Sequence, residues 1–338
     1  MAFTSIDNPE LYFQCKLYTG NGTDDTSITL DGTENMQPDL VWLKRRDNAG
    51  RHRLFDSVRG ATKSLRSDDD ENEITAADSL KSFDSDGFTL GADSASGGIN
   101  VNINTETMVA WCWKESATAG FDIVSFTGNG SARTISHSLS AVPRVIMPKA
   151  RSTDGYEWRI YHASNTSAPE TDYLVLNQTY ATADGLNVFN DTAPTSSVFS
   201  IGDGETPNNS GTTYIAYLFA PKQGYSAMGS YLAEGNADGV YVNLGFRPAF
   251  LLIKNQSSAS TNWHIYDSKR LGYNVNNDMQ RANLTNGDAT DDDLDLLSNG
   301  FKIRRVTTAL NTDGDTYVYM AFAEAPFVNS KGVPTNAK

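Results

Sequence analysis

Apolar residues along the chain either alternate with polar ones or come in short runs. Within residues 13–18, Phe13, Cys15 and Leu17 occupy alternate positions, as on one face of a strand. The runs "LVWLK" (40–44) and "FLLIK" (250–254) are apolar at consecutive positions, which predicts strands covered on both faces. Turns such as "TGNG" (19–22) separate the strands. Only residues 76–81 suggest a helical turn or two, so the pattern predicts an all-β protein.

A proline-led apolar run that ends in lysine occurs three times at equal spacing. The prolines lie 105 residues apart, and the runs are Pro38–Lys44, Pro143–Lys149 and Pro248–Lys254. Each run is expected to be a central core strand, because a proline costs little at a strand entrance. The lysine is expected to mark the point where the chain returns to water. Pro148 interrupts the second run and predicts a bulge or a shortened pairing there.

Other strand-like segments fall into the same register. Second apolar strands are expected at 51–57, 157–163 and 262–268, and closing aromatic strands at 107–114, 213–220 and 316–323. This regularity predicts three tandem β-sandwich, jelly-roll-like repeats of about 105 residues. The expected repeats are residues 1–117, 118–223 and 224–327, followed by a flexible C-terminal tail at 328–338. Units of this size have room for their own cores, so we expect beads on a string whose neighbours touch.

Composition and charge narrow the possible functions. Of 338 residues, 39% are hydrophobic and 20% charged, and there are 27 glycines, which suits a turn-rich β protein. The formal net charge of −14 disfavours nucleic acid as a partner, because the phosphate backbone is also negative. The chain has no run of 18 apolar residues and no basic start followed by an apolar stretch. We therefore expect neither membrane insertion nor a signal peptide.

Several segments resemble a repeat domain of tailed-bacteriophage virion proteins, which is especially common in marine phages. The resemblance covers nearly the whole chain and rests on words such as "FTGNGSARTISHSL" (126–139), "NDTAPTSSVFSIGD" (190–203), "LGFRPAFLLIK" (244–254) and "YVYMAFAEAPF" (317–327). It implies a β-sandwich component of the virion, a tail-fibre or other structural protein, without catalytic residues. It also implies synthesis in the host cytoplasm followed by assembly into the virion.

The search for chemistry finds no catalytic, cofactor-binding or metal-binding motif. The four histidines, His52, His137, His162 and His264, form no HxH or HxxxH pair. The acidic runs at 68–73 and 291–295 are interpreted as solvated loops, with weak calcium binding as the open alternative. Cys15 and Cys112 are expected to be buried free thiols, and a disulfide between them is the alternative.

Two sets of residues remain as candidate contacts for a glycan or a protein partner. The first is a basic cluster, Arg45, Arg46, Arg51 and Arg53, which could dock an acidic neighbour or an anionic glycan. The second is the pair Trp158 and Trp263, which could stack on a sugar if they are exposed, although packing in the core is the other interpretation.

These observations favour a non-enzymatic phage virion structural protein, a tail-fibre or appendage component that contacts the host surface. The alternative is a capsid decoration or cement protein on the phage head. A carbohydrate-binding module and a polysaccharide depolymerase are weaker hypotheses. The expected partners are other virion proteins, further copies in a homo-oligomer, and a host cell-surface glycan or receptor.

Overall fold

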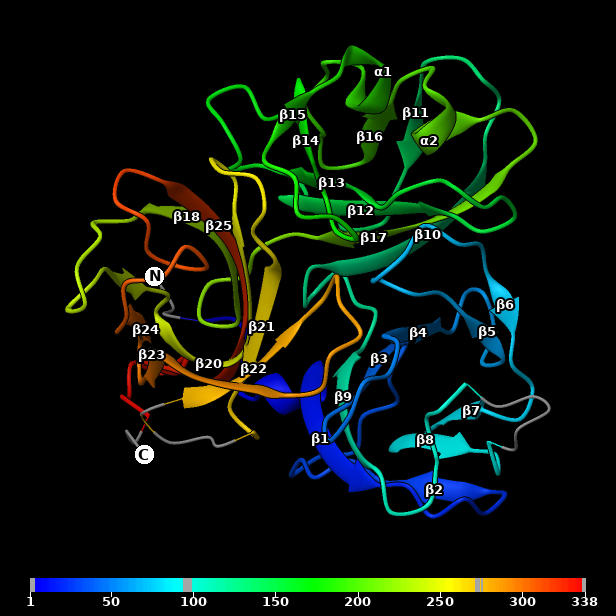
Figure 1. Ribbon diagram of the computed structural model, residues 1–338, viewed down its shortest axis with the longest axis vertical. Coiled ribbons are helices and arrows are strands. Elements are labelled where there is room, and N and C mark those ends of the chain that lie inside the picture. The colour runs from blue at the N-terminus through cyan, green and yellow to red at the C-terminus, as the bar shows by residue number, and fades with distance from the viewer. Residues whose placement is uncertain (1–3, 94–98, 271–273, 275, 336–338) are drawn as a thin grey trace.

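The computed structural model describes residues 4–93, 99–270, 274 and 276–335, and it is nearly all β. Figure 1 shows three lobes around a common centre. The described residues within 1–117, 118–223 and 224–327 are called the first, middle and last segments below. All named strand pairs are antiparallel. The prediction of an all-β chain is confirmed.

The first segment is a sandwich of two sheets. One sheet has the order β1 (Phe13–Thr19), β9 (Thr107–Trp113), β3 (Leu40–Arg45), β4 (Arg53–Asp56), and the other β2 (Thr26–Ile28), β8 (Gly87–Leu90), β7 (Leu80–Asp84). A 3₁₀ helix η1 (Pro9–Leu11) precedes them, and β5 (Lys63–Ser64) pairs with β6 (Ile74–Thr75). Side chains from both sheets, among them Val41, Phe55, Cys112 and Phe88, form a core between them.

The middle and last segments begin with the same strand order. The middle sheet is β10 (Phe121–Thr127), β17 (Thr213–Phe219), β12 (Val145–Ala150), β13 (Arg159–His162), β14 (Asp172–Val175), β15 (Ala183–Asp184). It faces β11 (Arg133–Ser136) and β16 (Val198–Ile201), with short helices α1 (Leu186–Phe189) and α2 (Glu205–Asn208). The last segment is one sheet, β18 (Ser226–Leu232), β25 (Thr316–Pro326), β20 (Phe246–Asn255), β21 (Trp263–Asp267), β22 (Asn276–Arg281), β23 (Ala289–Leu297), β24 (Gly300–Ile303), β19 (Tyr241–Asn243).

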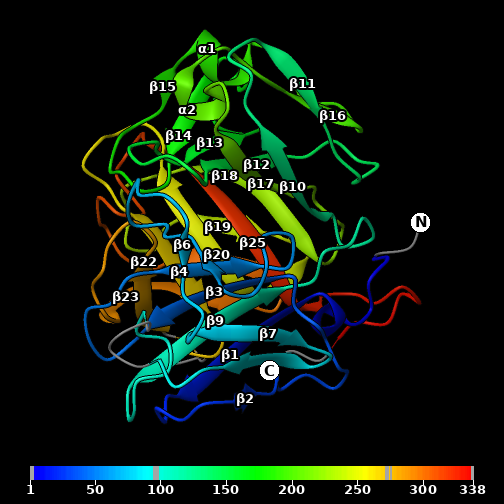
Figure 2. The same cartoon turned by 90° about the vertical axis from the view of Figure 1, so that its right-hand side faces the viewer.

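The three segments share one core at the centre of the molecule. In a strand successive side chains point to opposite faces, so a strand that is apolar throughout is buried on both sides. One hydrophobic cluster contains Trp42 from β3, Met147 from β12 and Leu252 from β20. Figure 2 shows these strands stacked one above another, with β12 above, β20 between and β3 below. The expectation of separate beads on a string is therefore wrong, because the sheets bury their second faces against one another.

Aromatic rings fill the centre of this shared core. The ring of Trp113 lies 5.3 Å from that of Phe250 and 6.5 Å from that of Phe219, and Phe219 lies 5.6 Å from Phe322, measured between ring centroids. The four rings come from all three segments. Edge-to-face contacts at such distances each contribute about 0.5–1.5 kcal/mol beyond the burial of area.

The three lysines that end the central strands do not return to water. Lys44, Lys149 and Lys254 are all 0% exposed. Each extends its ammonium group to a backbone carbonyl of a neighbouring segment: Lys44 Nζ donates to Asn286 O (2.6 Å), Lys149 Nζ to Asp70 O (2.9 Å) and Lys254 Nζ to Thr179 O (3.5 Å). These contacts join the first segment to the last, the last segment to the middle one, and the middle segment to the first. The three segments are thus linked in a closed ring. The prediction that these lysines mark the chain's return to solvent is wrong.

Two buried aspartate–arginine pairs reinforce the same junctions. Asp56 and Arg59 form an ion pair with both side chains fully buried, and the hydroxyl of Tyr217 in the middle segment donates to Asp56 Oδ2 at 2.7 Å. Asp267 and Arg270 form the corresponding pair, and Trp111 Nε1 of the first segment donates to Asp267 Oδ2 at 3.0 Å.

His162 occupies the third junction in place of such a pair. Its Nε2 lies 3.1 Å from the carbonyl oxygen of Tyr319 in the last segment. Each of the three junctions therefore contains a buried polar contact that crosses from one segment to its neighbour.

Pro148 shortens the pairing of its strand, as its position predicts. Strand β12 pairs with β13 over only two residues, Val145 and Ile146, whereas β3 pairs with β4 over four. Pro148 lacks the N–H that would continue the ladder. Strand β20 instead has register shifts on both sides of Pro248.

The segment expected to be a flexible tail is folded back through Thr335. Val328 bridges Pro334, Thr335 N donates to Phe327 O, and Ser330 N donates to Asp7 Oδ1 at 2.6 Å. The end of the last segment is thereby tied to the beginning of the first.

The buried lysines predict that the protein becomes more stable between pH 7 and pH 9. Burial lowers the pKa of Lys44 and of Lys149 to about 8, and that of Lys254 to about 7. In this window the folded lysines release protons that the unfolded chain, with lysine pKa values near 10.4, still holds. The unfolded state therefore binds more protons, and the free energy of unfolding rises with pH.

Urea unfolding at pH 7 and pH 9 measures this rise. Lys254→Met should reduce it by about 1–2 kcal/mol relative to the wild type. Lys331→Met, at an exposed lysine, is the matched control and should leave it unchanged. If the free energy of unfolding of Lys254→Met rose as much between pH 7 and pH 9 as that of the wild type, the lowered pKa of Lys254 would be contradicted.

Candidate functional site

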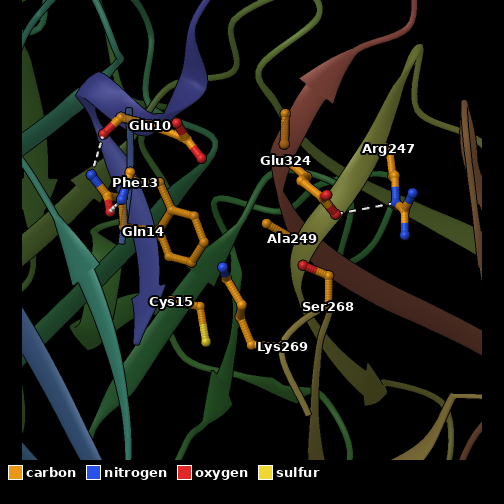
Figure 3. Close-up of a pocket in the computed structure, with 11 residues that line it drawn as sticks. Glu10, Phe13, Gln14, Cys15, Arg247, Ala249, Ser268, Lys269 and Glu324 are labelled. Carbon is orange, nitrogen blue, oxygen red and sulfur yellow. Dashed lines mark hydrogen bonds and ion pairs between the residues drawn. The ribbon is translucent and has the colours of Figure 1, made fainter. Parts of the chain in front are cut away.

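A cavity of about 350 Å³ lies where the first and last segments meet. Figure 3 shows β1 on one side of it, with Phe13, Gln14 and Cys15, and the last segment on the other, with Arg247 and Glu324. This junction brings the first strand of the chain beside β20 and β25, which sequence reasoning did not anticipate.

The charged groups of the cavity differ in how they are engaged. Arg247 Nε lies 3.1 Å from Glu324 Oε2, so these two side chains form an ion pair. Glu10 Oε2 accepts a hydrogen bond from Thr33 N at 2.9 Å. Lys269 is exposed, and in the part of the chain that the structure describes its ammonium group makes no ion pair. A single unpaired positive charge therefore faces the cavity.

The thiol in the cavity is not a nucleophile at neutral pH. Burial, with a further contribution from the charge of Asp267, raises the pKa of Cys15 well above that of a free thiol. Cys15 lies opposite Trp111 in the β1–β9 ladder while Cys112 lies opposite Gln14, so the two thiols point to opposite faces of the sheet. Both cysteines are buried and free, which confirms the first interpretation and excludes a disulfide between them.

The histidines form no metal site within the described ranges. No group of three His, Cys, Asp or Glu side chains in those ranges could hold a metal ion. Burial lowers the pKa of His162 to about 4, of His264 to about 3, and of His52 well below its usual value. These rings are therefore neutral at physiological pH.

The two acidic runs have different structures. Asp68 and Asp69 pair with Arg51, and both carboxylates are mostly buried. The run at 291–295 lies inside strand β23 and not in a loop, which corrects the prediction. There Asp293 accepts a hydrogen bond from the hydroxyl of Tyr266 at 2.7 Å, so its carboxylate bonds to strand β21 and does not face solvent.

The predicted basic cluster is neutralised by neighbouring carboxylates. Arg45 pairs with Glu106 at 2.6 Å, Arg46 with Asp288 at 2.8 Å, and Arg51 with Asp68 at 3.0 Å. Arg53 is only 8% exposed. The four arginines therefore do not form an open cationic surface, and the Arg46–Asp288 pair joins the first segment to the last.

The two tryptophans are buried, which confirms the interpretation that they pack in the core and leaves neither indole exposed to stack on a sugar. Trp158 is 0% and Trp263 3% exposed. Trp158 Nε1 donates to Arg66 O at 2.7 Å, and Trp263 Nε1 donates to Val175 O at 2.8 Å. Each indole thus crosses a junction to the preceding segment, and a buried indole needs such a partner for its N–H.

A carboxyl pair lies at the junction between the first and middle segments. Glu115 follows β9, and burial, together with a hydrogen bond to Asp122, raises its pKa to about 7. Asp122 accepts hydrogen bonds from the Ser138 hydroxyl (3.0 Å) and its N–H. Glu115 Oε1 also accepts from Ile123 N at 3.4 Å, so the carboxyl group spans the start of β10.

Comparison with known families gives one match, which is to the family described as a domain of unknown function (DUF7483), over residues 8–326. The chain belongs to this family. The family domain spans all three segments, which agrees with the single core that they share. No curated protein matches the chain. Among the described residues, no helix is long and apolar enough to cross a membrane.

Glu115→Gln should stabilise the protein more at pH 7.5 than at pH 5. A carboxyl group with a raised folded pKa keeps its proton between about pH 4.3 and 7, while the unfolded chain loses it. The protonated Glu115 carboxyl group therefore contributes fully to the free energy of unfolding at low pH, and this contribution is lost as the pH rises through 7. Because Glu115 is partly exposed, the difference between the two pH values should be about 1 kcal/mol.

The comparison is made by thermal and urea unfolding of the wild type and the variant at both pH values. Glu34→Gln, at an exposed carboxylate that makes no ion pair within the described residues, serves as the control. If Glu115→Gln stabilised the protein no more at pH 7.5 than at pH 5, the Glu115–Asp122 pair would be shown not to share a proton.

Proposed function

We propose that this protein is a non-enzymatic structural component of a tailed-bacteriophage particle, in a tail fibre or other appendage that contacts the host surface. The resemblance to virion repeat proteins supports the proposal. The observation that carries it is the use of polar side chains to hold segments together, by Lys44, Arg59, Lys149, Trp158 and Trp263. Groups that could do chemistry in an open cleft are engaged instead in building a rigid body, which suits a scaffold.

We further propose that the three segments are tandem jelly-roll-like repeats of one unit, closed into a ring. The equal spacing of the prolines and the ring of lysine contacts support this arrangement. A closed body of this kind is a compact knob and not an extended arm. Loops at its surface would carry contacts to other virion proteins, to further copies of the chain, and to a host glycan or receptor.

The second candidate is a decoration or cement protein on the phage head. The compact body favours it, since a knob with a shared core can sit across neighbouring capsid subunits and stabilise them by binding. An appendage protein would be found only at the tail.

Immunogold electron microscopy of purified particles, with an antibody against the folded chain, distinguishes these candidates. The proposal predicts label on the tail or its appendages, and an antibody treatment that reduces adsorption to host cells. Label spread over the head would replace the appendage with the decoration role. Particles without any label, alongside a labelled known virion protein as the control, would contradict the structural role in the virion.

A further inference from the structure

Strand β1 has an unpaired edge that faces the cavity. It is the outermost strand of its sheet and pairs only with β9. Hydrogen-bonded pairs alternate along an antiparallel ladder, and Lys114 N donates to Tyr12 O, so the even-numbered residues of β1 bond to β9. The N–H and C=O groups of Phe13 and Cys15 therefore point away from β9. Within the described residues these groups have no hydrogen-bond partner.

The corresponding edge of the middle sheet is covered by the chain itself. The connection from β9 to β10 runs beside the start of β10, where Ser116 and Phe121 exchange two backbone hydrogen bonds of 3.0 and 3.1 Å. The side chain of Glu115 accepts from the next outward N–H, that of Ile123. This connection thus behaves as a short added strand.

The last sheet repeats the arrangement at β18. Ser226 N donates to Lys222 O at 2.9 Å, and Lys222 N donates to Ser226 O at 3.3 Å. In both cases the segment that arrives from the preceding sheet occupies the outward edge of the first strand.

The first sheet lacks this cover. The residues before β1 form the 3₁₀ helix η1, where Tyr12 N donates to Pro9 O as Tyr225 N donates to Lys222 O. Pro9, however, has no N–H to donate to Phe13 O as Lys222 N donates to Ser226 O. Glu324 lies inside β25, at the position that corresponds to Glu115 after β9, and it pairs with Arg247. Strand β25 then continues beside β20, with Pro326 opposite Phe246. The cavity lies between β1 and the last segment, beside this edge (Figure 3).

We propose that the cavity between β1 and the last segment is a docking site for an extended segment of a partner polypeptide, which adds along the free edge of β1. The chain's own connection from β9 to β10 shows what fits this position, since residues 114–120 are rich in small residues. Strand addition of this kind takes its affinity from main-chain hydrogen bonds. The proposal does not depend on where in a phage particle the protein resides.

The charges at the site specify one side chain of the partner. A carboxylate that accepts from Cys15 N, as Glu115 accepts from Ile123 N, would lie on the side of the cavity that Cys15 and Lys269 line together (Figure 3). The preferred segment therefore carries one acidic residue followed by small residues. The volume of about 350 Å³ has room for a short stretch of chain and not for a folded domain.

A fluorescent peptide with blocked ends and the sequence KESATAG, which copies residues 114–120, tests the proposal with the full chain. Fluorescence polarisation should show saturable binding in the high-micromolar range, as expected of a short peptide that loses freedom on binding. A peptide with proline in place of its serine lacks one backbone donor and should bind about tenfold more weakly.

Two variants locate the binding. Lys269 is exposed, so Lys269→Glu should fold normally, bind the peptide about fivefold more weakly, and bind a version with lysine in place of glutamate more tightly than the wild type does. Ala249→Trp, checked for folding by circular dichroism, should fill the cavity and abolish binding. Lys331→Glu, at an exposed lysine that does not line the cavity, is the control. The proposal would be overturned if the wild type showed no saturable binding up to millimolar peptide. It would also be overturned if Lys269→Glu and Ala249→Trp bound the peptide as tightly as the wild type does.

Discussion

The structure depends on the burial of both faces of its central strands. Strands β3, β12 and β20 each direct one face into their own segment and the other into the shared centre. Full burial of a large apolar side chain contributes about 1.5–3 kcal/mol, and three tryptophans of the first segment are completely buried. If one segment were removed, apolar faces of the other two would be exposed to water. The three sheets can therefore be stable only together.

This burial explains the buried charges. Where two sheets meet over a dry core, the ends of their strands leave carbonyl oxygens that need donors. Lys44, Lys149 and Lys254 supply them, at the cost of taking an ammonium group out of water, which is why their pKa values fall. A buried ion pair adds little to stability compared with apolar side chains, but its loss is costly. Asp56–Arg59 and Asp267–Arg270 thus fix how neighbouring sheets are placed more than how strongly they adhere.

Much of the fold could be predicted from the sequence, because strand patterns are local. The runs at 40–44 and 250–254 are core strands, and Pro148 shortens its pairing. The relation between segments could not be predicted in the same way. A lysine that ends an apolar strand has the same local pattern whether it meets water or a carbonyl 242 residues away, as Lys44 meets that of Asn286. The arrangement of the segments is decided by the burial of each sheet's second face against another sheet, and this burial depends on residues far apart in the sequence.

Local sequence patterns also failed to predict the candidate site. The basic cluster and the tryptophans were chosen by residue type, but carboxylates and carbonyls from distant positions occupy them. A signal for the buried pairs was present, since "FDSVR" (55–59) and "YDSKR" (266–270) place aspartate and arginine three residues apart. The cavity at β1 left no sequence signal, because it arises where the first strand meets the last sheet.

The claim that the three segments form one cooperative body is tested most directly by differential scanning calorimetry of the full chain. The decisive quantity is the ratio of the calorimetric enthalpy of unfolding to the van't Hoff enthalpy. If the shared core couples all three sheets, the ratio should be about 1 with a single transition. A ratio of about 3, or three resolved transitions, would show that the segments unfold independently and would contradict the account.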